Sequence, residues 1–224
     1  MSRRTFLWCL LLSVLTACTL EAEEKDPSGK LGFFFGGLYA YQTVLGDFTG
    51  DLYLFGAGQA CVVPEVGDGW GWGGLLGSRE HFFPGLEIGL EIAYTRSAHV
   101  GTWGGASQFE SRLEIWGFDI RMYPIRLSLF EPFVLLGGCG STITVFDGAT
   151  DGSIIGDAIF NGWGWDLGGG ASLLIGKHLS LVAQAVYHWT RYNTVEMIDE
   201  IALTISDGLE GRGFGFSALL LITL

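Results

Sequence analysis

The chain has 224 residues, of which 49% are hydrophobic and only 16% charged, with 36 glycines and a formal net charge of −12. The negative charge argues against nucleic acid as a partner, because nucleic-acid binding relies on Lys and Arg that neutralise phosphates. Beyond the N-terminus no apolar run reaches the roughly 20 residues of a membrane-spanning helix, which argues against a helical membrane protein.

The first element in the chain is an export signal. Two arginines precede an apolar stretch at 6–17, and small residues and a polar run follow it. The four residues that end at Cys18, Leu-Thr-Ala-Cys, resemble a bacterial lipoprotein box, which implies cleavage before Cys18 and acylation of its thiol. Ordinary cleavage near Ala17 or Ala22 is the alternative. The predicted organisation is a signal peptide (1–17), a polar linker (18–29) and a folded domain (30–224).

The folded domain consists of short segments in which apolar residues alternate with small or polar ones, the period of a β-strand. The clearest segment, 163–175, sets Trp, Leu and Ile on one face against a face made almost entirely of glycine. A soluble sandwich places large polar residues on its second face, whereas glycine fits the crowded interior of a narrow tube with lipid outside. The predicted strands are 31–44, 70–76, 85–95, 108–123, 131–146, 163–175, 179–192 and 211–224.

The second strand has a rival. Residues 51–63 also alternate, and if both 51–63 and 70–76 span, the sheet has ten strands. The sequence therefore predicts an all-β fold, a closed antiparallel up-and-down transmembrane β-barrel of eight strands, or of ten in the alternative. A closed sheet suits lipid because it satisfies every backbone hydrogen bond without water.

The connections predict the orientation of the barrel. One set is short and contains bases: 78–81, 124–126 and 176–178. The other set is longer and mostly acidic: 45–69, 98–107, 147–157 and 193–210. Short turns mark the periplasmic side of outer-membrane barrels and long loops the outside. The acidic loops have two interpretations. The first is a binding surface for divalent cations or basic host surfaces, and the simpler alternative is a solvated surface without a ligand.

The hairpin of the sixth and seventh strands has a predictable register. Its aromatic residues must all face lipid, which requires an odd number of residues in the turn. A three-residue turn at 176–178 pairs Trp165 with Trp189 and brings Tyr187 close to both, as expected of an aromatic belt at the membrane interface. The predicted girdle is Trp116, Trp163, Trp165, Tyr187 and Trp189.

The same register places Asp166 opposite His188 inside the barrel, where we expect a hydrogen bond or an ion pair. Alternation along the other strands completes a predicted interior polar cluster: Glu87, Glu91, Asp119, Arg121, Asp166, Gln184 and His188. A barrel of eight strands is only wide enough to be filled by its own side chains, so a structural plug is favoured over a cation path. Acids outnumber bases in this cluster, and the sequence does not explain the surplus.

No catalytic, cofactor or metal site is predicted. His188 begins a His-x-Thr triplet similar to the His-x-Ser arrangement of lipid-modifying enzymes, but it faces the interior, and Ser172 lies about 20 Å along the strand from Asp166. Cys61 and Cys139 form no cluster with zinc spacing. We expect two isolated thiols, with a disulfide between them as the alternative.

Together these features resemble the small outer-membrane β-barrels of the OmpX, OmpW and OmpA membrane-domain type. The resemblance covers about 30–224 and departs at Leu224, since such proteins usually end on an aromatic residue that the assembly machinery recognises. It implies the outer membrane of a diderm bacterium, with outer-membrane lipid and the barrel-assembly machinery as partners.

The expected function is that of a non-enzymatic structural or surface-interaction protein, whose acidic extracellular loops meet a host or other extracellular ligand. The alternative is an OmpW-like narrow channel for small hydrophobic solutes. A lipid-modifying outer-membrane enzyme is the remote third reading.

Overall fold

The computed structural model describes residues 32–50, 52–55, 59–83, 86–103, 107–125, 129–146, 157–175, 178–197 and 202–224. The chain divides into two compact units, Met1–Lys30 and Leu31–Leu224, and all described residues belong to the second. The predicted signal peptide (1–17), the linker (18–29) and Cys18 lie outside them. Among the described residues no helix is long and apolar enough to cross a membrane.

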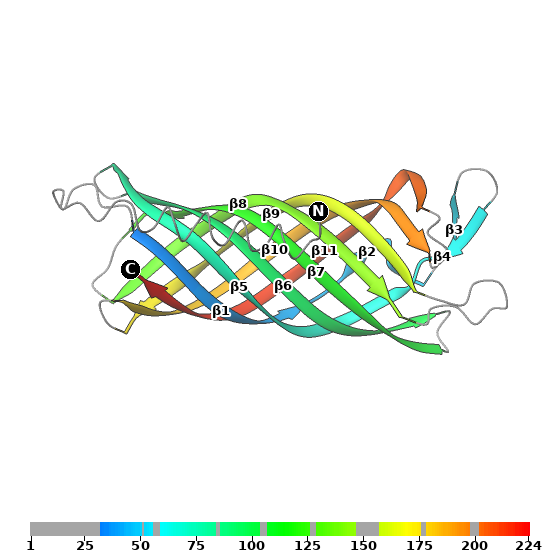
Figure 1. Ribbon diagram of the computed structural model, residues 1–224, viewed down its shortest axis with the longest axis horizontal. Helices are drawn as coiled ribbons and strands as arrows, with labels where there is room; N and C mark the ends of the chain where they lie inside the picture. Colours follow the sequence, from blue (N-terminus) through cyan, green and yellow to red (C-terminus); the bar gives the residue numbers. More distant parts are fainter. Residues whose placement is uncertain are drawn as a thin grey trace, which may run out of the picture. The chain divides into compact units, whose positions relative to one another are not determined.

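Eight long strands form one closed antiparallel sheet (Figure 1). They are β1 (Gly32–Gln42), β5 (Glu65–Phe83), β6 (Leu86–Trp103), β7 (Ser107–Tyr123), β8 (Phe130–Val145), β9 (Ala158–Leu174), β10 (Leu179–Met197) and β11 (Ala202–Thr223). Each pairs with its neighbour in the chain order, and β1 pairs with β11 to close the ring. The predicted up-and-down barrel of eight strands is thus confirmed.

The rival second strand, 51–63, is not part of the barrel wall. It holds β3 (Leu52–Phe55) and β4 (Gln59–Val62), which pair only with each other in a separate two-stranded sheet. Strands of four residues span roughly 13 Å, too little for a membrane. Because β1 pairs directly with β5, no further strand fits between them, and the alternative of ten strands is wrong.

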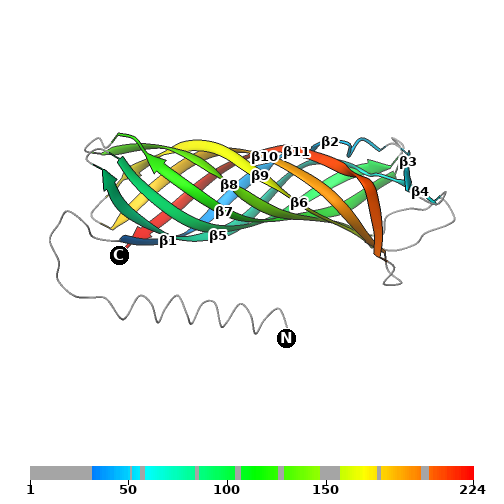
Figure 2. The same cartoon turned by 90° about the horizontal axis from the view of Figure 1, so that it is seen from above.

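The two ends of the barrel differ (Figure 2). We call the end that carries β3 and β4 the loop end, and the end at which β11 finishes the turn end. A two-residue strand, β2 (Leu45–Gly46), pairs with β11 at the loop end.

Several strands are longer than predicted. The connection predicted at 98–107 is reduced to the few residues between β6 and β7. The connection predicted at 193–210 is likewise reduced to the residues between β10 and β11. Residues 78–81, predicted as a turn, belong to β5. The prediction failed because polar side chains mark where the wall leaves the apolar membrane, whereas strand pairing continues as long as backbone groups find partners.

The outward wall is apolar where lipid would contact it. On β7 the exposed residues Trp116, Phe118 and Ile120 alternate with buried ones, and toward the loop end the same face carries Glu114 and Glu110. The apolar band therefore ends near Trp116, as predicted. The ambiguous faces of β8 are resolved as well: Leu135 is inside at 1% exposure and its two neighbours are outside.

The interior holds two apolar clusters. The loop-end cluster consists of Val44, Phe48, Val63, Val66, Phe109, Leu113, Ile115, Cys139, Ile143, Val145, Phe160, Tyr192, Val195, Ile205 and Leu209. The turn-end cluster consists of Phe34, Leu38, Ala40, Leu75, Tyr123, Phe133, Val182, Leu219 and Leu221. The interior is therefore not a purely polar plug, because side chains from both clusters fill most of the space between the charged residues.

Candidate functional site in the barrel interior

The hairpin of β9 and β10 has the predicted register. Trp165 pairs with Trp189, and Asp166 pairs with His188. The Trp165 ring centroid lies 6.0 Å from that of Trp189 and 5.9 Å from that of Tyr187. The structure places the five girdle residues on the outward wall: Trp116, Trp163, Trp165, Tyr187 and Trp189.

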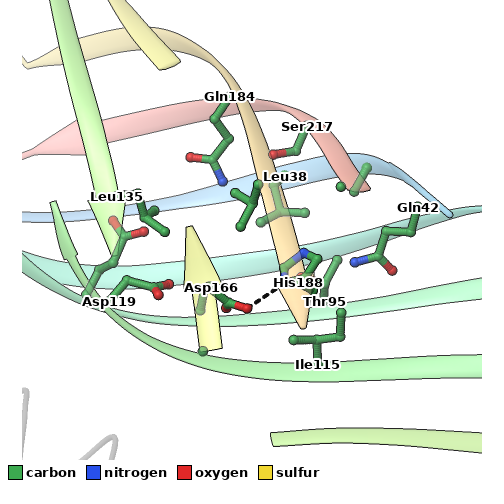
Figure 3. A pocket seen from close by; sticks show the side chains of 16 residues that line it. Leu38, Gln42, Thr95, Ile115, Asp119, Leu135, Asp166, Gln184, His188 and Ser217 are labelled. Atoms are coloured by element: carbon green, nitrogen blue, oxygen red, sulfur yellow. Dashed lines mark hydrogen bonds and ion pairs between the residues drawn. The ribbon is translucent and has the colours of Figure 1, made fainter. Parts of the chain in front are cut away.

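Asp166 and His188 are joined inside the barrel (Figure 3). Asp166 Oδ1 lies 2.7 Å from His188 Nδ1, and the Asp166 side chain is buried. A carboxylate on Nδ1 fixes both the orientation of an imidazole and the nitrogen that carries the proton. The ring of His188 is thus held in one position in the middle of the barrel.

The structure places the predicted interior residues in two groups. Buried are Glu87, Glu91, Asp119, Arg121 and Asp166, whereas Gln184 and His188 are half-buried. Glu87 and Glu91 of β6 and Arg121 of β7 belong to a charge network toward the turn end. Asp119, Asp166 and His188 line a cavity in the middle of the barrel.

The network at the turn end is built on two arginines. Arg121 has no exposed surface, lies 2.8 Å from Glu91 Oε2, donates to Gln184 Oε1 at 3.1 Å and stacks 4.1 Å from the Phe133 ring centroid. Buried charges of this kind persist only when they are paired and hydrogen-bonded.

Arg79 is the second arginine, and the sequence reading missed it. It donates to Glu131 at 2.8 and 3.0 Å and also pairs with Glu87, whose other oxygen lies 2.9 Å from His81 Nε2. Arg79 and His81 were assigned to a turn, which is wrong. Every second residue of β5 from Leu75 onward faces the interior, and this series includes Arg79 and His81. Extending the alternation past residue 76 would have identified both.

The middle of the barrel contains a group that we call the mid-barrel cluster: Asp119, Cys139, Asp166 and His188. One ligand atom each of Cys139, Asp166 and His188 lies within 4.8 Å of the other two. Cys139 is a buried free thiol, so the alternative of a disulfide with Cys61 is wrong. The sequence reading missed this cluster because its members come from adjacent strands and not from a local motif.

Side chains fill the described interior on both sides of two small cavities. The cavity in the middle measures about 40 Å³ and a second one nearer the loop end about 20 Å³. Phe160, Ile143 and Leu209, which have no exposed surface, fill the barrel on the loop side, and Arg121 and Leu135 fill it on the turn side.

No known family model matches the sequence, and no characterised protein matches it by sequence. Its fold is similar to that of the outer membrane protein OprG from Pseudomonas aeruginosa, with a TM-score of 0.56 and 14% identity over 88% of this chain and 97% of that one. It is also similar to Neisserial surface protein A, with a TM-score of 0.50 and 13% identity over 85% and 96%. The chain therefore has the fold of the small outer-membrane β-barrels, as the sequence predicts.

The structures that it resembles are proteins of the bacterial outer membrane, the location that the sequence predicts for this chain. In outer-membrane barrels of this fold the longer connections lie outside the cell. By that rule the loop end would be the outer face and the turn end the periplasmic face.

The outer-membrane barrel has a third polar group, near the loop end, that the sequence reading did not find. Ser97 Oγ lies 2.6 Å from His99 Nε2 and also contacts Gln42, and His99 Nδ1 lies 2.7 Å from the Gly67 carbonyl oxygen. Burial lowers the pKa of His99, and the Gly67 contact opposes this only in part. Ser97 and His99 are both buried, and the two ring nitrogens of His99 meet Ser97 and the Gly67 carbonyl oxygen.

Proposed function

We propose that this outer-membrane barrel is a non-enzymatic surface protein that acts through its acidic loop end and not through its interior. The observation that carries the proposal is the filled barrel. Fully buried side chains of both apolar clusters and of the arginine network occupy its length, and the cavities between them measure only about 40 and 20 Å³. Because a filled barrel offers no conduit, the rim at the loop end is the surface that remains for a partner.

The rim has the charge for a cationic partner. Its exposed acids are Asp47, Glu65, Asp68, Glu110, Asp157, Glu196 and Asp207. Three of the bases there are engaged by groups of the same chain: Arg212 lies 2.6 Å from Glu210, Arg191 donates to the Asp207 carbonyl oxygen at 3.1 Å, and Arg112 stacks on the Phe146 ring. The acids therefore dominate the field that an approaching partner meets.

The experiment is a binding assay on the intact rim. The triple variant Glu65→Gln, Glu110→Gln and Glu196→Gln removes three exposed acids of the loop end. In nanodiscs, we expect it to bind a cationic polypeptide such as polylysine more weakly than wild type, with a smaller dependence on salt. Glu80→Gln, an exposed acid at the turn end, is the matched control when binding is measured on intact cells. Equal cell binding by the triple variant and the control would refute the role of the rim.

The filled interior is tested separately. Purified protein in a planar bilayer is expected to show no stepwise conductance, and in vesicles to show no lipid hydrolysis or acyl transfer. A reproducible conductance step would refute the closed barrel, and turnover of lipid would refute the non-enzymatic role.

A second candidate function is passage of small hydrophobic solutes, which the apolar lining of the loop-end cluster favours. Pairing of β1 with β11 ends at Gln42 and Gly215, and the smaller cavity lies beside Thr43 and Gly213 just beyond that point. Phe48, edge-on to Phe160 at 5.6 Å between ring centroids, fills the lumen there. Under this function, Phe48→Ala raises uptake of a hydrophobic tracer by cells, whereas under the rim function uptake stays at the level of cells without the protein.

A further inference from the structure

We propose that the mid-barrel cluster binds a single divalent transition-metal ion of borderline softness, with Zn²⁺ as the best match. Cys139 of β8, Asp166 of β9 and His188 of β10 offer sulfur, oxygen and nitrogen atoms within 4.8 Å of one another. This mixed donor set suits Zn²⁺, whereas Ca²⁺ and Mg²⁺ select oxygen ligands. The site is independent of the proposed surface function.

Asp119 provides a second, independent observation. Together with Asp166 and His188, but without Cys139, it lines the cavity in the middle of the barrel (Figure 3). It is 4% exposed, and its Oδ1 has no hydrogen-bond partner among the described residues. A methyl group built on Gly117 would lie 3.0 Å from Asp119 Oδ2 and 3.5 Å from Asp166 Oδ2. The Oδ2 atoms of the two carboxylates therefore share the space above Gly117, and the unpartnered Oδ1 of Asp119 lies over Gly137, which pairs with Asp166. A buried carboxylate oxygen without a partner in this position points to a missing cation.

The charges nearby do not supply that cation. Arg121 forms its ion pair with Glu91, and Arg79 forms its ion pairs with Glu87 and Glu131. Among the described ion pairs, none falls on Asp119, and Asp166 has only His188. A bound M²⁺ neutralises two carboxylates at once, which accounts for the surplus of acids that the sequence left unexplained.

Small movements would convert the observed arrangement into a metal site. His188 Nδ1 and Asp166 Oδ1 are 2.7 Å apart and share a proton. Two ligands of a tetrahedral zinc ion lie about 3.3 Å apart, so the ion replaces that proton and the pair opens by about half an ångström. Asp119, or a water molecule in the adjoining cavity of about 40 Å³, completes the four ligands.

The position of the cluster determines how the metal is loaded. Apolar side chains of the loop-end and turn-end clusters lie on both sides of it, so an ion reaches it while the barrel closes and is then retained. The test therefore starts from the unfolded chain.

The experiment uses the full chain with Cys9, Cys18 and Cys61 replaced by alanine, which leaves Cys139 as the sole thiol. The protein is unfolded in urea with a chelator, refolded into detergent with Zn²⁺ or Co²⁺, desalted and assayed for metal by mass spectrometry. We expect about one metal ion per chain and, with Co²⁺, the near-ultraviolet charge-transfer band of a cobalt–thiolate bond.

The variants decide whether this cluster is the site. Cys139→Ser is near-isosteric and should abolish the cobalt–thiolate band, and His188→Gln should reduce retained metal at least tenfold. His99→Gln, which changes a buried histidine outside the cluster, should retain the metal. Folding is verified for each variant by its heat-dependent migration on gels. Folded parent protein without metal after desalting, or equal retention by Cys139→Ser and the parent, would overturn the proposal.

Discussion

Two charged layers lie inside this barrel, and they are built differently. Toward the turn end, Arg79 meets Glu87 of the neighbouring β6 and Glu131 of the distant β8, and Arg121 meets Glu91 of the neighbouring β6. Each positive charge thus has at least one negative charge within hydrogen-bonding distance. In the mid-barrel cluster two aspartates face a histidine and a thiol, and one aspartate oxygen has no partner among the described residues. The first layer is complete in its ion pairs, although Glu91 Oε2 and Arg121 Nε and Nη1 make no hydrogen bond among the described residues. The second layer requires a proton or a cation from outside the chain.

The largest expected effect breaks the complete layer. Arg121→Met removes the guanidinium and leaves Glu91 buried without its ion-pair partner. Breaking a buried pair in this way costs about 3–5 kcal/mol, so the urea midpoint in lipid vesicles should fall strongly. Replacing both residues, Arg121→Met with Glu91→Leu, removes the orphaned charge and should recover most of the loss. If the double variant is no more stable than the single one, the pair is not the source of the effect.

The next effect has the opposite sign and concerns the incomplete layer. In protein refolded without metal, Asp119→Asn removes a buried carboxylate that has no ion-pair partner, and we expect the free energy of unfolding to rise by about 1–2 kcal/mol. Asp166→Asn is the matched control and should lower it, because His188 loses its carboxylate. Urea titrations of both variants measure the difference, and equal losses would show that Asp119 is satisfied.

A smaller effect depends on pH and involves His99. This residue lies outside the apolar, membrane-spanning band, which on β6 ends at the charged residue Arg96. Burial lowers the pKa of His99, and the Gly67 carbonyl oxygen and the charge of Asp68 oppose this shift. The unfolded chain therefore takes up the proton first, so stability is fully present above about pH 6.5 and falls as the pH drops below it. Urea midpoints at pH 8 and pH 5.5 should differ less in His99→Gln than in wild type, and identical pH profiles would exclude His99 as the cause.

The smallest effect concerns an ion pair in water. Arg212 and Glu210 lie 2.6 Å apart, as close as the buried pair, but the Arg212 side chain is half exposed at the rim. Exposed pairs contribute little because water and salt screen them. Arg212→Ala should leave the urea midpoint unchanged within error. A loss comparable to that of Arg121→Met would mean that burial is not what distinguishes the two layers.

The sequence predicts the local part of this structure well. Alternation identified eight strands, and the short connection after β9 fixed the pairing of Asp166 with His188. The sequence does not predict the pairing register of strands that long connections join. Cys139 reaches Asp166 only through the pairing of β8 with β9, and the chain between these two strands is too long to set that register.

Two further features depend on distant strands. The sequence predicts a turn at Arg79 because bases are common in the short turns. The residue belongs to β5, and its partner Glu131 lies on the distant strand β8. The apolar loop-end cluster was missed because inward and outward residues are both apolar on strands such as β8, and only the closed sheet separates them.

The central claim, a closed interior, is tested most directly by the reactivity of Cys139. In the background without other cysteines, refolded with chelator into lipid, we predict that a small charged thiol reagent leaves Cys139 unlabelled in the folded barrel and labels it fully in urea. Thr204→Cys, exposed near the loop end, should be labelled at once in the folded state and serves as the matched control. Labelling of Cys139 in the folded barrel at a rate close to that of the Thr204→Cys thiol would contradict the account.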